Sequence, residues 1–200
     1  AYVGGEAVAP SILAVTGNNA IVDWVFLELR SATTPTVLIA TKRALLQRDG
    51  DVVSPTDGTS ALSFTGLAGN SYFVSVKHRN HLGAMTAAPQ QLTPTGTVVD
   101  FTTMTAANLY NQAGFDGAEM VTVGSVKALW AGDANGDNKI KHQGGGSDNP
   151  TILSQVLTHP GNIGGVYNYN AGFGYYSGDI NLDGKVKYQG TGNDTNFIFF

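Results

Sequence analysis

The sequence predicts a mainly β protein, with an N-terminal antiparallel β-sandwich followed by a small loop-helix domain. Three observations favour this fold class. Charged residues make up only 13% of the chain, 26 glycines interrupt it, and short apolar runs alternate with turn residues. With 42% hydrophobic residues among 200, the chain can bury a core in each of two domains.

Residues 1–104 form the predicted β-sandwich domain, with roughly seven strands. Residues 20–30 are apolar on both faces for most of their length, which is typical of a central strand. Residues 36–41 give a second strand, and residues 72–79 alternate between apolar and polar side chains, as in a strand with one wet face. Residues 97–103 supply a last strand.

A turn-strand pattern inside this region carries a first resemblance. From Leu67 to Val76 the chain reads Leu-x-Gly-x-x-Tyr-x-Val-x-Val, which resembles the signature of prealbumin-like and other surface β-sandwich repeats. The resemblance implies a spacer or a binding platform. Beyond this domain, residues 105–130 read as a connector, and residues 131–200 form a second domain.

The second domain contains a duplicated acidic loop. Asp133-x-Asn135-x-Asp137 recurs as an Asp-x-Asn-x-Asp segment 46 positions later, and the match continues through a Gly-rich insert to a late aspartate in each copy. Such a repeat marks the motif as a structural element. In both copies an aliphatic residue, Ile140 or Val186, follows the acidic segment and is expected to point inward.

The chemistry of the repeat is that of a calcium loop, in which oxygens at positions 1, 3 and 5 and a main-chain carbonyl at position 7 surround one cation. Position 6 requires a left-handed backbone, and Asn138 and Gly184 tolerate it best. The late aspartate of each copy is expected to complete the coordination. The sequence therefore predicts ten ligands: Asp133, Asn135, Asp137, Lys139 and Asp148, then Asp179, Asn181, Asp183, Lys185 and Asp194.

These ligands predict two bound Ca²⁺ ions. Six of the fifteen acidic residues lie at ligand positions, where they repel one another unless a cation is present. Two Ca²⁺ ions would offset the net charge of -4. Magnesium fits less well because it demands a tighter octahedral geometry. The alternative is that Asp, Asn and Gly cluster here because they form turns.

The repeat resembles the dockerin-type loop-helix pair, with a longer loop and a 46-residue spacing. It is also similar to duplicated modules that follow β-sandwich segments near the ends of large secreted bacterial adhesin-like proteins. A helix is expected over residues 149–158, with Asp148 both binding metal and capping the helix. The resemblance implies a structural or calcium-binding role.

Composition and motifs narrow the function classes. A net charge of -4 with scattered basic residues argues against a nucleic-acid partner, and the chain lacks an apolar run long enough for membrane insertion. Neither disulfides nor thiolate sites exist without cysteine. Because no nucleophile, phosphate-loop or zinc-protease motif occurs, we expect no enzyme. His78 to His81 reads as the wet end of a strand.

We expect a secreted or cell-surface structural protein stabilised by calcium. The alternative is an adhesive module that recognises a glycan or a protein partner. The apolar end, Phe197 to Phe200, has two interpretations: it folds back onto the helix near Ile152 to Leu157, or it inserts into a second copy and drives homo-oligomer or filament formation.

Overall fold

The computed structural model describes residues 7–111 and 119–198. It divides into two compact units. The first comprises Ala1–His78 and Gly83–Leu129, and the second comprises Arg79–Leu82 and Trp130–Phe200. The second unit therefore begins close to the predicted boundary at residue 131. It also includes a short segment, Arg79–Leu82, that the sequence did not assign to it.

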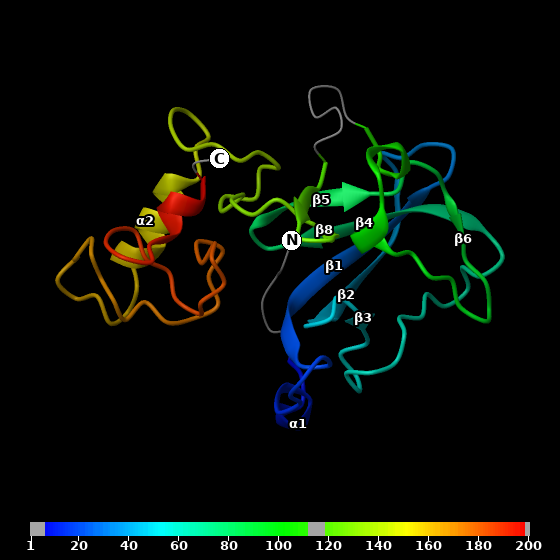
Figure 1. Cartoon of the computed structure of the whole chain (residues 1–200), viewed down its shortest axis with the longest axis horizontal. Helices are drawn as coiled ribbons and strands as arrows, with labels where there is room; N and C mark the ends of the chain where they lie inside the picture. The colour runs from blue at the N-terminus through cyan, green and yellow to red at the C-terminus, as the bar shows by residue number, and fades with distance from the viewer. Residues whose placement is uncertain (1–6, 112–118, 199–200) are drawn as a thin grey trace. The chain divides into compact units, whose positions relative to one another are not determined.

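An antiparallel sheet of six strands organises the first unit (Figure 1). Five strands follow the order β3-β2-β1-β4-β5, and β6 pairs with β4. Their bounds are β1 (Ile21–Ser31), β2 (Leu38–Gln47), β3 (Val52–Val53), β4 (Ser71–His78), β5 (His81–Met85) and β6 (Gln90–Gln91). The predicted strands at residues 20–30 and 72–79 correspond to β1 and β4. The strand predicted at residues 36–41 corresponds to β2, which begins later and extends further along the chain.

Strand β1 is central because it pairs with β2 on one side and with β4 on the other. On one face of this sheet its apolar side chains pack with those of both neighbours. Leu29 lies opposite Ala40 of β2 and opposite Val74 of β4. Leu29 is only 1% exposed and packs with Tyr72 and Val74. This alternation is what a pleated strand requires when one face is buried.

The predicted β-sandwich is wrong, although the mainly β class is confirmed. Among the described residues, the other sheet has just two strands, β7 (Val121–Val123) and β8 (Val126–Ala128). The buried face of the large sheet is instead covered partly by irregular chain, including Phe64 and Leu92. The strand predicted at residues 97–103 is wrong. Residues 97–100 are irregular, and Phe101–Thr103 form the 3-10 helix η1, where the Asp100 carboxylate accepts the Thr102 N–H at 2.9 Å.

The predicted connector at residues 105–130 also needs correction. Leu109 and Met120 are 3% and 7% exposed, and they pack with Ala84 of β5 in one apolar cluster. Residues 105–111 and 119–129 therefore belong to the first unit. The 3-10 helix η2 (Ala106–Asn108) lies within this stretch.

A buried ion-pair network occupies the other face of β1. Glu28 is 5% exposed and pairs with Arg30 at 2.6 Å and with Lys77 of β4 at 2.9 Å. Burial by itself would raise the pKa of Glu28, but the hydrogen bonds and charges of Lys77 and Arg30 outweigh it and lower that pKa. Near the N-terminal end of the described chain, a separate apolar contact joins the short helix α1 (Pro10–Leu13) to strand β2, because Ile12 packs with Leu45.

Helix α2 (Asn149–Leu157) and the 3-10 helix η3 (Asp194–Ile198) contribute to the core of the second unit. In Figure 1 the red η3 runs beside the yellow α2. The core residues are Ala134, Ile152, Val156, Ile180, Val186 and Ile198. The helix predicted at residues 149–158 is thus confirmed.

Among the described residues, no helix combines the length and apolar content needed to cross a membrane.

Burial of Ile198 bears on the two interpretations of the C-terminal end. Ile198 is 4% exposed and packs with Ile152 and Val156 of α2, so this part of the segment folds back on its own unit. Phe197 is 38% exposed. Phe199 and Phe200 lie outside the described residues.

Candidate metal centre

The first acidic loop is shaped by hydrogen bonds from its own backbone. Asp133 is 4% exposed and accepts the N–H of Asp137 on Oδ1 and that of Asn138 on Oδ2, both at 3.0 Å. The Asp137 N–H also reaches Asn135 Oδ1 at 2.9 Å. The Lys139 N–H donates to Asp137 Oδ1 at 2.9 Å. Side chains at positions 1, 3 and 5 therefore each fold over the backbone that follows them.

The second loop repeats this pattern bond for bond. Asp179 is 2% exposed and accepts the N–H of Asp183 at 3.0 Å and that of Gly184 at 3.1 Å. The Asp183 N–H reaches Asn181 Oδ1 at 2.9 Å, and the Lys185 N–H donates to Asp183 Oδ1 at 3.2 Å. The sequence repeat is thus a repeat of geometry.

Two positions in each loop adopt the left-handed backbone. The prediction for position 6 is confirmed, with φ of 64° at Asn138 and 86° at Gly184. Position 4 does the same, with φ of 74° at Gly136 and 58° at Leu182. Sequence reasoning missed position 4, because a leucine gives no signal for a left-handed backbone.

The late aspartate of the first loop has a different role from the predicted helix cap. Asp148 is completely buried and accepts the Asn135 N–H on Oδ1 at 3.2 Å and the Lys141 N–H on Oδ2 at 2.8 Å. It occupies the N-cap position of α2, as predicted, but its side chain makes no capping hydrogen bond to the helix. The carboxylate instead joins the beginning of the loop to its end.

Asp194 does the same in the second loop. It is completely buried, and its Oδ1 accepts the N–H groups of Ile180 at 2.8 Å and Asn181 at 3.2 Å. Its Oδ2 accepts the Lys187 N–H at 2.7 Å. A carboxylate offers about four acceptor positions, so these bonds orient the group without exhausting it.

Lysines stabilise the Gly-rich inserts, a role that the sequence did not suggest. Lys141 Nζ donates to the carbonyl of Gly145, and Lys187 Nζ donates to that of Thr191, each at 2.8 Å. The two residues occupy equivalent positions in the repeat. Each closes the insert by bonding four residues ahead, and this brings the late aspartate back to the acidic segment.

Burial disfavours the charged form of the first and the late aspartate in both loops. Burial raises the pKa of Asp133 and of Asp148, and the Asp148 charge further raises that of Asp133. Burial also raises the pKa of Asp179, against the charge of Arg79, and raises the pKa of Asp194 to about 6. Burial therefore places carboxylates of each loop where water solvates their charged form poorly.

The segment Arg79–Leu82 places a cation beside the second loop. Arg79 Nη2 lies 3.5 Å from Asp179 Oδ2, and Arg79 Nε donates to the Tyr176 carbonyl at 3.0 Å. Its guanidinium lies 4.2 Å from the centre of the Tyr175 ring. The Asn80 amide donates to the Asp179 carbonyl. No sequence signal links Arg79 to a loop 100 positions away.

The residues supply calcium-type donors, but their side chains do not converge. Among the described residues, no three Asp, Glu or His side chains lie close enough together to hold a metal ion. The Lys185 ammonium group lies 3.3 Å from Asp183 Oδ2. The donor chemistry, the left-handed position 6 and the burial of both first aspartates fit Ca²⁺. The loops would have to tighten around the ion.

The aliphatic residues that follow each acidic segment do point inward. Val186 is completely buried in the core of the second unit, and Ile140 packs against the same core. Gly132 leaves room for Ile140, because a Cβ there would come within 2.8 Å of its Cγ2. Both loops are therefore anchored through equivalent positions, as the repeat predicts.

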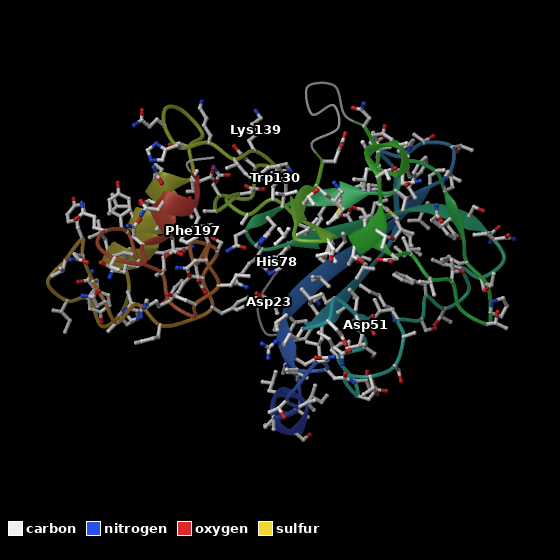
Figure 2. The ribbon with its side chains drawn as sticks, viewed as in Figure 1. Asp23, Asp51, His78, Trp130, Lys139 and Phe197 are labelled. Atoms are coloured by element: carbon white, nitrogen blue, oxygen red, sulfur yellow. The ribbon has the colours of Figure 1, made fainter. Side chains whose placement is uncertain are left out.

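The His78 to His81 segment is not simply the wet end of a strand. His78 Nε2 lies 3.0 Å from Asp23 Oδ2, and both side chains are about 5% exposed. Figure 2 shows the two labelled side chains next to each other. His78 thus has a structural partner in β1.

Comparison with known protein families, curated proteins and solved structures finds no match to this chain.

Proposed function

We propose that this chain is a calcium-stabilised structural module that works outside the cell, with one Ca²⁺ in each loop. The observation that carries the proposal is the duplicated loop geometry, in which equivalent side chains accept equivalent backbone N–H groups in both copies. Each ion would take the oxygens at positions 1, 3 and 5, the main-chain carbonyl at position 7, and the late aspartate.

The extracellular setting is proposed because it would supply enough calcium. Extracellular calcium modules bind at about 10⁻⁴ to 10⁻³ M, which matches free calcium outside cells and not in the cytosol. We assign a structural role and not an enzymatic one, because the buried aspartates of the two loops accept backbone hydrogen bonds and thereby shape the loops. A dockerin-like loop-helix pair remains the closest description of the second unit, with α2 following the first loop and η3 the second.

Calorimetric titration of the chelator-treated full chain tests this proposal. We expect two Ca²⁺ ions per chain, and one ion in Asp137→Ala or in Asp183→Ala, since each substitution removes a ligand oxygen from an exposed residue. Asp51→Ala, at an exposed acidic residue of the first unit, is the matched control and should leave the stoichiometry at two.

Thermal unfolding gives an independent readout. A ligand that binds only the folded state stabilises it by about 2.7 kcal/mol at a hundredfold excess over its dissociation constant. Melting curves should therefore separate in calcium and in chelator. Coincident curves, together with no calorimetric heat, would refute the calcium proposal.

Self-assembly through the C-terminal segment is part of the proposed structural role. Phe197 is the exposed member of the described part, whereas Ile198 belongs to the core. Phe197→Ser therefore tests association better than deletion of the whole segment, which would remove a core residue. Light scattering in calcium should show a smaller assembly for Phe197→Ser. An unchanged size would exclude Phe197 as a contact.

A second candidate function, adhesion, is favoured by exposed apolar side chains between the two loops. Ile163, Phe173 and Tyr175 are 97%, 65% and 55% exposed. Exposed aromatic and aliphatic residues gathered in one segment are typical of a binding surface. A glycan array probed with the full chain, with and without calcium, separates adhesion from a purely structural role, because a spacer gives no specific signal in either condition.

A further inference from the structure

A groove in the second unit lies where the two loops and helix α2 meet. Its volume is about 540 Å³, within the range of small-molecule sites. The residues that matter most for its chemistry are His142, Gln143, Asn149, Leu153, Tyr188 and Gln189. All of them belong to the second unit.

The repeat itself builds this groove. Gln143 of the first loop and Gln189 of the second lie at equivalent positions, and so do His142 and Tyr188. Each loop therefore contributes one amide and one ring to the same groove. The loops' hydrogen bonds fix these positions, since Lys141 and Lys187, the residues just before each pair, are held by the late aspartates.

The lining defines the class of ligand. Within residues 7–111 and 119–198, no Asp, Glu, Lys or Arg lines the groove. Gln143 and Gln189 are exposed, and each amide offers both donors and an acceptor. Leu153 and the Tyr188 ring add an apolar surface. Tyr188 also contacts Tyr167, with ring centroids 6.3 Å apart at a steep angle, which restricts its orientation.

One buried acceptor adds to this picture. Asn149 Nδ2 donates to the His142 carbonyl at 2.9 Å, but the buried Asn149 Oδ1 accepts no hydrogen bond from the part of the chain that the structure describes. An unsatisfied buried acceptor is unfavourable. If the groove wall opened slightly, a ligand hydroxyl group could donate a hydrogen bond to Asn149 Oδ1 and remove this unfavourable free energy.

We propose that this groove binds a neutral saccharide. Sugars present many hydroxyl groups that both donate and accept, together with an apolar C–H face. Paired amides, an unsatisfied acceptor and a tyrosine ring complement both features. The described lining residues include amides, hydroxyl groups and rings but no Asp, Glu, Lys or Arg, which favours a neutral ligand over an ionic one. The proposal requires no ion in either loop, so it stands apart from the calcium proposal.

The test uses the full chain and a panel of neutral probes: glucose, galactose, mannose, N-acetylglucosamine and their short oligomers. Saturation-transfer NMR identifies a binder, and titration gives its affinity, in calcium and in chelator. We expect Gln143→Ala and Gln189→Ala each to weaken binding by up to about tenfold, and the double variant to weaken it further. Both side chains are exposed, so the fold should be kept.

Asn170→Ala is the matched control, because Asn170 is an exposed amide residue of the same unit that does not line the groove. Its affinity should equal that of the unmodified chain. Backbone NMR spectra confirm that each variant is folded. The proposal is overturned if no neutral saccharide binds in either buffer, or if the groove variants bind as well as the control.

Discussion

The two units satisfy their backbones in different ways. In the first unit, β1 forms ladders of main-chain hydrogen bonds with β2 and β4. In the second, the loops turn their N–H groups toward carboxylates, and Asp194 alone accepts three of them. Regular structure in the described part of that unit includes a nine-residue α-helix and a five-residue 3-10 helix.

The difference teaches where each unit is vulnerable. A sheet spreads its hydrogen bonds over many residues, so one polar substitution removes little of the network. A loop organised by one buried carboxylate concentrates several bonds on a single side chain, and losing it leaves several N–H groups unpaired. Each unit contains one tryptophan, Trp24 in the first and Trp130 in the second, which allows their unfolding to be followed separately.

The largest effect is expected for Asp194→Ala. Three backbone N–H groups lose their acceptor, at about 1–3 kcal/mol each, so the free energy of unfolding of the second unit should fall by at least about 3 kcal/mol. Urea unfolding of a Trp24→Phe background, followed by Trp130 fluorescence, measures this loss. The first unit, followed by Trp24 in a Trp130→Phe background, should be unaffected.

Asp183→Ala is the control for this substitution, measured in chelator. Asp183 is exposed and accepts one loop N–H, at 3.2 Å from Lys185, so its loss should cost well under half as much. Equal losses for the two variants would show that the buried aspartate does not organise the loop.

A smaller effect, with a marked pH dependence, is expected for Glu28→Gln in the first unit. The carboxylate pairs with Arg30 and Lys77 while buried, so the substitution should cost about 1–3 kcal/mol at pH 7. The folded-state pKa of Glu28 lies below its usual value of 4.5. Its stabilising effect is therefore complete above about pH 4.5 and disappears as pH falls through the lower folded-state pKa.

Urea unfolding followed by Trp24 between pH 7 and pH 3 checks this sign. The stability difference between Glu28→Gln and the unmodified chain should shrink toward low pH. Asp51→Asn, at an exposed position, serves as the control. A difference that stays constant down to pH 3 would contradict the ion-pair origin of the effect.

Substitutions at position 6 test the left-handed backbone in both copies of the loop. Gly184→Ala should destabilise the second unit by about 1–2 kcal/mol, because alanine is strained at φ of 86°. No neighbouring atom lies within 4 Å of the added Cβ, so backbone strain alone is measured. Asn138→Gly, at φ of 64°, should change stability by less than about 0.5 kcal/mol. Trp130 fluorescence in urea reports both; a neutral Gly184→Ala would argue against the left-handed backbone.

The smallest effect concerns Arg79, which stands beside the second loop. If that loop binds Ca²⁺ as proposed, Arg79 repels the ion, and Arg79→Gln should tighten the second site by up to about tenfold, or about 1.4 kcal/mol. Calorimetric titration in an Asp137→Ala background isolates that site. Arg43→Gln, in strand β2 of the first unit, is the control. Weaker binding in Arg79→Gln would show that Arg79 supports the site instead.

Local pattern predicted the elements that depend on local forces. Strand β1, strand β4 and helix α2 follow from alternation, apolar runs and a proline in the first helical turn. Position 6 followed from the conformational freedom of glycine and asparagine. The sandwich was mispredicted because apolar alternation shows that one sheet face is buried without showing whether strands or loops cover it.

The sequence by itself determined that the acidic loop is duplicated, which residues repeat, and that an aliphatic residue anchors each copy. These follow from spacing, which the chain carries from one residue to the next. Only the tertiary structure decided that Asp148 and Asp194 join the ends of their loops, that Arg79 lies beside Asp179, and that Gln143 and Gln189 share one groove. Each of these depends on residues brought together by packing around the core of Ile152, Val156 and Val186, and no local pattern encodes such contacts.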